Sequence, residues 1–271
     1  MTASDSGAPA QRNNSASLRK ALSILLHIGG ETDGDGFTLT RLSEELGINK
    51  STVVRLLQPL LETHFVEQNE STGVYQLGWQ NAQLGQAYLA GVRVDLDMHQ
   101  ILVELTRRSG ETSHLVRAAS PSVVYIDKVD SPHAVRMVSR VGNSQPMYST
   151  SVGKCILAHA DESTLQAVLA AGMPRRTPTT ITTEAGMRAE LQRIREQGWA
   201  IDDVENEDGI RCVAAPVFDA DGRCQHAISA SGPVSRVPRD RVPQLVPLVT
   251  GAAAEISRRM GAPSTAAGGP V

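Results

Sequence analysis

Five polar side chains on one short stretch of the sequence have the chemistry that contact with nucleic acid requires. They are Lys50, Ser51, Thr52, Arg55 and Gln58. Serine and threonine hydroxyls bind phosphate oxygens, and an arginine guanidinium can form two hydrogen bonds with one guanine. We therefore expect these side chains to contact double-stranded DNA, which requires that a single helix present all five on the same side.

The residues around them predict that helix and a second helix before it. Leucines recur three and then four positions apart from Leu39, as on one side of a short helix whose start Thr38 can cap. Gly47 should end this helix, because glycine adopts left-handed backbone angles at little cost. The second helix begins at about Lys50, and its apolar residues face inward: Val53, Leu56, Leu57, Leu60 and Leu61. Two short helices joined by a tight turn form a helix-turn-helix.

The next segment predicts a hairpin, which makes this unit a winged helix-turn-helix. Residues 64–68 and 74–77 have the composition of two strands, and residues 69–73 that of a turn.

Two features argue against ordinary DNA contacts. Pro59 lacks the amide that would bond to the residue 55 carbonyl, so the helix should kink or end early. Residues 17–90 carry five Lys and Arg against eight Asp and Glu, a net charge of −3, whereas DNA-binding domains usually have a basic surface.

Composition limits the classes of protein that the chain can represent. Its 271 residues are enough for two modest domains, each with a sizeable core. The net charge of −3 gives no general attraction to nucleic acid or membranes. Three cysteines without a CxxC spacing fit a reducing compartment better than a disulfide framework. No apolar run approaches the roughly 20 residues that cross a bilayer, and the N-terminus lacks an apolar signal core. We therefore expect a cytoplasmic protein without a membrane partner.

The second half of the chain contains helices and strands in groups. Helices are expected at residues 97–109, 152–158, 162–171, 184–197 and 242–260. Strands are expected at residues 112–119, 123–129, 135–141, 199–202, 211–218 and 224–231. Asp221-Gly222 marks a hairpin turn between the last two strands. Because the two kinds of element are grouped and do not strictly alternate, they favour an α+β fold with a mixed or antiparallel sheet and flanking helices.

Two features of this half could bind a small anion. Residues 151–153 open a helix, whose free N–H groups and dipole suit a carboxylate or a phosphate. Ser229 and Ser231 are two positions apart in an expected strand, so they project from the same face. The same residues are also compatible with an ordinary capped helix and an ordinary strand.

Other groups could bind a metal or catalyse a reaction, but none completes a recognised pattern. Cys155 with His159, and Cys224 with His226, are spaced as pairs of metal ligands, yet neither has a partner pair at zinc-site spacing. An enzyme with Cys212 or a serine as nucleophile is the competing class. The serines lack a GxSxG elbow, and no histidine has a recognisable catalytic context. We therefore expect no metal, no cofactor and no catalytic residue.

Several segments, in their order and spacing, resemble the IclR family of bacterial transcriptional regulators from about Leu18 to Gly261. The N-terminal ones are LRKALSILL, STVVRLL and YQLG. The later ones are MYSTSVGKCILA at 147–158, GIRCVAAPVF at 209–218 and ISASGP at 228–233. The resemblance implies a winged helix-turn-helix, a linker helix and a C-terminal GAF-like effector domain, assembled as a homodimer or homotetramer. Pro59 and the acidic loop at residues 31–36 depart from what we expect of the family's DNA-binding unit.

The resemblance also implies an effector pocket. Its residues would be Ser151, Val152, Gly153, Asp202, Cys212, Ser229, Ser231 and Met137, with Ala134 in the apolar wall and Gln145 nearby. A small organic acid would place its carboxylate at the helix N-terminus. Asp202 would then bond to a hydroxyl or keto oxygen at the other end of the ligand, which favours hydroxy or keto acids.

We accordingly predict five parts: a disordered segment at 1–16, a winged helix-turn-helix at 17–78, a linker helix at 79–96, an effector-binding domain at 97–260 and a loose tail at 261–271. The predicted function is operator binding controlled by a small organic acid, in repression or activation. The alternative is a small-molecule sensor or interaction protein with weak or no DNA binding, which the acidic N-terminal domain and Pro59 keep open.

Overall fold

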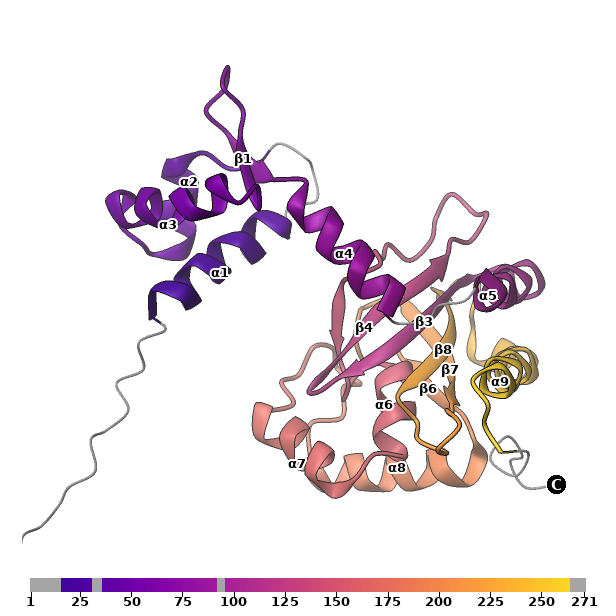
Figure 1. Cartoon of the computed structure of the whole chain (residues 1–271). Helices are drawn as coiled ribbons and strands as arrows, with labels where there is room; N and C mark the ends of the chain where they lie inside the picture. Colours follow the sequence, from indigo (N-terminus) through magenta and orange to yellow (C-terminus); the bar gives the residue numbers. More distant parts are fainter. Residues whose placement is uncertain (1–15, 31–35, 92–95, 264–271) are drawn as a thin grey trace, which may run out of the picture. The chain divides into compact units, whose positions relative to one another are not determined.

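The computed structural model describes residues 16–30, 36–91 and 96–263, and the chain divides into two compact units, Met1–Gly91 and Val92–Val271. Each unit has its own core and is described by itself (Figure 1). The segments expected to be disordered or loose lie almost wholly outside the described residues, as does most of the acidic loop at 31–36.

The first unit is the predicted winged helix-turn-helix. Its elements are α1 (Ala16–Gly29), α2 (Leu39–Leu46), α3 (Lys50–Glu62), β1 (Val66–Gln68), β2 (Tyr75–Leu77) and α4 (Gln80–Gly91). Strands β1 and β2 pair antiparallel and form the wing, which Figure 1 shows as a hairpin projecting from the helices. A core that includes Ile24, Leu42, Val53 and Leu57 joins α1, α2 and α3 under this hairpin.

Local hydrogen bonds fix the turn between α2 and α3. The Thr38 hydroxyl accepts the Arg41 N–H at 3.2 Å and caps α2, as predicted. Gly47 ends α2 with φ of 63°, which confirms the need for glycine there. The side chain of Asn49 accepts the Thr52 N–H at 2.9 Å and caps α3, a cap that the sequence reasoning did not identify.

Pro59 was expected to kink α3 or end it early, and the early end is wrong. The helix continues through Pro59 to Glu62. Proline removes only one backbone bond, and the buried side chains of Val53, Leu56 and Leu57 fix the helix against the core. Packing of an apolar face therefore outweighs the local cost of the missing bond.

The second unit is built on one six-stranded sheet. Its strands are β3 (Thr112–Ala119), β4 (Ser122–Val129), β5 (Ser144–Pro146), β6 (Ala200–Asp203), β7 (Ile210–Val217) and β8 (His226–Pro233). Their order is β5-β4-β3-β8-β7-β6, and every neighbouring pair is antiparallel. The α+β class is therefore confirmed, with an antiparallel sheet. The turn between β7 and β8 contains Asp221 and Gly222, as predicted, and Gly222 has φ of 72°.

The strand predicted at residues 135–141 is absent from the structure. Alternation is present, because Met137 and Ser139 are buried between exposed neighbours. This segment pairs with no strand, however, since the edge of β4 pairs with β5, where Val124 is opposite Ser144. The alternating burial therefore belongs to a segment that packs against the second unit without joining its sheet.

Helices cover both faces of the sheet and enclose two separate cores (Figure 1). The helices are α5 (Leu96–Ser109), α6 (Ser151–Ala158), α7 (Glu162–Ala171), α8 (Glu184–Gln197) and α9 (Val242–Arg259), with a short 3-10 turn at Arg239–Arg241. Helices α6, α7 and α8 pack on one face, and α5 and α9 pack on the other. Among the described helices, none is long and apolar enough to cross a membrane.

The predicted linker helix at 79–96 corresponds to α4, which covers Gln80–Gly91. Residues 92–95 lie outside the described residues, and α5 begins at Leu96.

Candidate functional site

Helix α3 presents the predicted DNA-contacting residues on its outer side. Lys50, Ser51, Arg55 and Gln58 are exposed, and Thr52 is half-buried. The inward side carries the apolar residues of the core. One helix therefore displays all five predicted side chains, as the sequence reasoning required.

The five side chains differ in how free they are to bind a partner. The Ser51 hydroxyl donates to Asn49 at 3.0 Å, and the Gln58 amide donates to Glu62 at 2.9 Å. Lys50 and Arg55, by contrast, have no ion-pair partner within the part of the chain that the structure describes. These two cations are the groups most readily available for phosphates or bases.

Seven of the eight predicted effector residues line one pocket in the second unit. Its lining residues are Tyr125, Met137, Thr150, Ser151, Val152, Asp202, Asn206, Glu207, Ile210, Cys212, Ser229 and Ser231. Strand register explains the convergence: Asp202 of β6 is opposite Cys212 of β7, and Cys212 is opposite Ser231 of β8. The N-terminus of α6 brings Ser151 and Val152 to the same place. Residues up to 106 positions apart in the sequence, Tyr125 and Ser231, thus line one pocket.

Gly153 does not line the pocket, although the resemblance placed it there. A Cβ atom at this position would lie 2.4 Å from the Cα atom of Met147, so glycine is required for close packing. The Gly153 N–H donates to the hydroxyl of Thr150, which caps α6. The amides of Ser151 and Val152 have no hydrogen bond to another described residue and are the donors left for an anion.

The sequence reasoning missed several pocket residues. Asn206 and Glu207 enter the pocket because the chain turns sharply after β6, and no sequence pattern identified that turn. Tyr125 could have been found, because alternate residues of β4 share a face. Ala134, expected in the apolar wall, is exposed and does not line the pocket. Gln145, expected nearby, accepts a hydrogen bond from the Asn206 amide at 3.3 Å.

The carboxyl group of Asp202 in the pocket is buried, and its pKa is near physiological pH. Burial raises its pKa to about 7, and the backbone N–H groups of Glu205 and Asn206 oppose this effect by donating to Oδ1 at 2.7 and 3.2 Å. Burial also raises the pKa of the Cys212 thiol, so this thiol is protonated. Asp202 can therefore donate or accept a hydrogen bond, and repulsion of an anionic ligand is weaker than it would be from a fully charged carboxylate.

Strong contacts hold the turn after β6 in a strained conformation. Val204 has φ of 64°, in a region that β-branched residues rarely adopt. The hydroxyls of Thr177 and Thr179 donate to its carbonyl oxygen at 2.6 and 2.7 Å. The hydroxyl of Thr180 donates to the Glu205 carbonyl at 2.7 Å. Strain of about 1–3 kcal/mol persists only where such contacts fix it.

A buried lysine ties this turn to α6. The Lys154 ammonium has no exposed surface and lies 2.5 Å from Glu205 and 3.2 Å from Glu190. Burial raises the pKa of Glu205, and its Oε2 atom has no hydrogen-bond partner among the described residues. Burial alone would also raise the pKa of Glu190, but the nearby Lys154 and Arg193 cations lower it. These contacts position the residues on either side of the pocket.

The pocket is small and partly open to solvent. Its volume is about 310 Å³ with the part open to solvent included, and the space inside has room for about one water molecule. An organic ligand must therefore displace part of the lining. Met137, on residues 130–143 between β4 and β5, is one of the lining residues contributed by segments without regular secondary structure.

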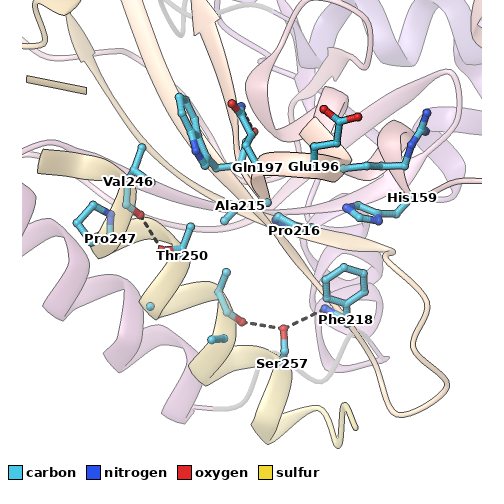
Figure 2. Close-up of a pocket in the computed structure, with 16 residues that line it drawn as sticks. His159, Glu196, Gln197, Ala215, Pro216, Phe218, Val246, Pro247, Thr250 and Ser257 are labelled. Carbon is cyan, nitrogen blue, oxygen red and sulfur yellow. Dashed lines mark hydrogen bonds between the residues drawn. The ribbon is translucent and has the colours of Figure 1, made fainter. Parts of the chain in front are cut away.

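A larger cleft lies between α9, the end of α8 and β7, and Figure 2 shows its lining. Its volume is about 1330 Å³ with open solvent included, so size alone would favour it. The hydroxyls on its α9 side are already bonded within the protein, however. Thr250 donates to the Val246 carbonyl at 2.9 Å, and Ser257 donates to Ala253 while accepting the Phe218 N–H. The smaller pocket, where polar groups converge, is therefore the stronger candidate for an effector site.

No group of three or more His, Cys, Asp or Glu side chains suited to a metal ion occurs in the described ranges. Cys155 is buried in the core on α6, whereas His159, its predicted pair, is exposed just beyond that helix.

We predict that replacing Asp202 by Asn changes how stability depends on pH. The folded-state pKa of about 7 exceeds the unfolded value of 3.8, so wild-type stability should fall relative to Asp202→Asn as the pH rises from about 4 to 8. The full difference is up to about 4 kcal/mol. Urea unfolding of both proteins at several pH values measures it, and histidine titration cancels in the comparison. A difference that stays constant over this range would contradict the assignment.

Comparison with known proteins agrees with this arrangement. Residues 17–70 match the IclR helix-turn-helix domain, and residues 86–258 match the bacterial transcriptional regulator IclR C-terminal domain. The chain is 35% identical over 252 residues to the HTH-type transcriptional regulator KdgR of Escherichia coli, covering 93% of this chain and 95% of that protein. It is 32% identical to the transcriptional repressor IclR of the same species, with 90% of each chain covered.

Solved structures give the same result. The Thermotoga maritima IclR structure is 33% identical, with a TM-score of 0.70 over 90% of this chain and 98% of that chain. The Alicyclobacillus acidocaldarius regulator is 30% identical, with a TM-score of 0.76 over 90% and 98% of the two chains. A family of regulators argues against the enzyme alternative. The chain belongs to the IclR family of DNA-binding bacterial transcriptional regulators with a C-terminal effector domain.

Proposed function

We propose that this regulator binds a small hydroxy or keto acid in the pocket between α6 and the sheet, and that the acid controls operator binding in the cytoplasm. One observation carries the proposal: Ser151 and Val152, whose amides are free at the start of α6, line the same pocket as Asp202, Ser229 and Ser231. The amides suit a carboxylate, and the other groups suit a hydroxyl or a keto oxygen. Cys212 and Met137 supply apolar surface for the carbon chain.

Separation of the charges makes this ligand class favourable. Asp202 and Glu207 line the pocket, and no Lys or Arg does. A carboxylate placed beside them would be repelled, whereas at the α6 N-terminus it meets a positive dipole. A hydroxyl or keto group at the other end then satisfies Asp202. A plain fatty acid would leave Asp202 without a partner, and a neutral sugar would leave the α6 amides without an anion.

The DNA contacts that we propose come from Lys50, Ser51, Thr52, Arg55 and Gln58 of α3. The exposed side of α3 and its two unpaired cations support this assignment. With a net charge of −3 on residues 17–90, one such unit has little electrostatic attraction to DNA. Affinity should therefore depend on two or more units binding together.

A second copy of the chain is the partner that we propose for the exposed apolar side of α1. Leu18, Leu22 and Leu26 are 60%, 46% and 75% exposed and recur every fourth residue, so they lie on one side of the helix. Trp79, at the start of the linker, is 55% exposed in the same unit. Pairing two copies would cover this surface and set two α3 helices on half-sites about one DNA turn apart, or a multiple of one turn.

We predict that Arg55→Ala weakens specific DNA binding by about 1–3 kcal/mol, because a charge-assisted contact to a base or phosphate is lost. The probe is the region upstream of the protein's own gene, and the measurement is a mobility shift. Arg107→Ala is the control, because it removes the same charge from an exposed site on α5. Equal binding by Arg55→Ala and wild type would mean that α3 is wrongly assigned. Failure of wild type to bind specifically would favour the sensor alternative.

We predict a homodimer or homotetramer that Leu22→Glu weakens, because a carboxylate would enter the proposed apolar interface. Light scattering at micromolar concentration should show a multiple of the 28.9 kDa chain mass for wild type and a lower mass for the variant. Lys20→Gln changes the net charge by the same amount at another exposed position of α1 and should leave the mass unchanged. A monomeric wild type with full DNA affinity would contradict the proposal.

We predict that hydroxy and keto acids raise the melting temperature, whereas neutral polyols do not. Binding should stabilise the protein by about 2.7 kcal/mol at a hundred times Kd. The panel consists of lactate, pyruvate, glycerate, gluconate and benzoate beside glycerol and sorbitol. Asp202→Ala and Ser229→Ala should abolish the shifts, and Ser163→Ala on α7 serves as the control. Shifts caused only by polyols, or unaffected by both pocket substitutions, would show that the site is elsewhere.

A further inference from the structure

Residues 130–143 contribute Met137 to the pocket lining, and we call them the cover segment. Their inner side chains, Met137 and Ser139, are 6% and 7% exposed, whereas Val135 and Val138 are 70% and 86% exposed. Met137 lines the pocket directly. Because the pocket has room for about one water molecule, an organic ligand fits only if a lining segment such as this one moves.

A buried histidine connects this cover segment to the pocket wall. His114 of β3 is 1% exposed, and its Nε2 atom lies 2.7 Å from the Ser139 hydroxyl of the cover segment. Its Nδ1 atom lies 3.5 Å from the hydroxyl of Ser229, which itself lies 3.3 Å from that of Ser231. Register places His114 directly opposite Ser229 on the neighbouring strand β8. The imidazole thus lies between a pocket hydroxyl and a hydroxyl of the cover segment.

The surroundings of His114 keep it neutral. Burial and the Lys128 ammonium lower its pKa to about 3, against a smaller opposing effect from Asp130. The same Lys128 Nζ donates to the Ser139 carbonyl at 2.6 Å, and Tyr125 packs against the ring at 4.7 Å between centroids. A neutral imidazole has one donor and one acceptor nitrogen. If Ser229 donates to Nδ1, then Nε2 must donate to Ser139. In the other tautomer, Nδ1 donates to Ser229 and Nε2 accepts from Ser139.

We propose that His114 is a positioning residue of the effector site, which couples the hydrogen bonds of Ser229 in the pocket to closure of the cover segment through Ser139. A ligand oxygen that bonds to the Ser229 hydroxyl either competes with the Nδ1 atom of His114 or fixes which of these two groups donates. Because one imidazole nitrogen donates while the other accepts, the hydrogen bond between Nε2 and Ser139 changes as well. This inference rests on the proposed effector site, and it names how occupation of that site reaches the segment that covers it.

The thiol of Cys212 provides a test without any ligand. Cys212 lines the pocket and is 7% exposed, so its reaction with methyl methanethiosulfonate requires opening of the pocket. Cys155 and Cys224 are buried elsewhere in the core and report general unfolding in the same sample. Peptide mass spectrometry of the full chain gives the three rates separately.

Two substitutions separate the two ends of the imidazole. The Gln amide reaches the position of Nε2, so His114→Gln should keep the Ser139 bond and raise the Cys212 rate much less than His114→Asn does. The Asn amide reaches only the position of Nδ1, so His114→Asn should raise the rate about tenfold, the effect of one lost buried hydrogen bond. Ser139→Ala should do the same from the other partner. Val138→Ala, at an exposed position of the cover segment, is the matched control and should have no effect.

Coupling between Ser229 and Ser139 is tested by making Ser229→Ala both in the wild-type protein and in His114→Gln. Ser229→Ala should change the Cys212 rate in the wild-type background and leave it unchanged in the His114→Gln background, where the contact to Ser229 is already lost. Equal rates for His114→Asn and His114→Gln, or equal effects of Ser229→Ala in both backgrounds, would overturn the proposal. If all three thiols react faster in His114→Asn, Ser139→Ala decides: an unchanged Cys212 rate overturns the proposal. A screen in which no acid binds would overturn the proposed ligand class and leave this thiol experiment to decide the role of His114.

Discussion

A buried ammonium group is the constraint on which the effector domain depends. Lys154 has no exposed surface, and a charge withdrawn from water requires close partners, because an unpaired one costs several kcal/mol. Its contact with Glu205 fixes the turn after β6, and the amides of that turn bond to Asp202. Because Lys154 itself belongs to α6, the same contact sets the helix N-terminus against this turn. The two ends of the proposed ligand site are thereby held in one geometry.

The two units solve opposite electrostatic problems. The DNA-binding unit is acidic overall and must bind a polyanion, and α3 presents two cations, Lys50 and Arg55, that have no ion-pair partner among the described residues. The ligand that we propose for the effector domain is an anion beside the acidic groups Asp202 and Glu207, and backbone amides would bind it in place of cations. Because amides carry no net charge, they do not attract every anion, and the shape of the ligand matters. Selectivity then comes from the groups opposite the amides.

Prediction from the sequence succeeded where local chemistry decides the structure. Gly47 and Thr38 behave as their residue types require, and alternation placed Ser229 and Ser231 on one face. It failed where packing over long distances decides. Nothing local shows that α3 continues through Pro59, or that residues 135–141 lie outside the sheet because another segment takes the edge of β4. The pocket itself came from family resemblance, which could not separate the packing role of Gly153 from ligand contact.

Control of DNA binding from the pocket requires that the pocket and α3 belong to one linked equilibrium. A ligand that binds two conformations of the protein equally does not shift the equilibrium between them. The most direct measurement is the affinity of one acid for the free protein and for its operator complex, by titration calorimetry. We predict unequal affinities, with a ratio equal to the change that the saturating acid produces in operator affinity, because such coupling is reciprocal. Equal affinities for the two forms, with the acid bound in the pocket, would contradict control of DNA binding from this site.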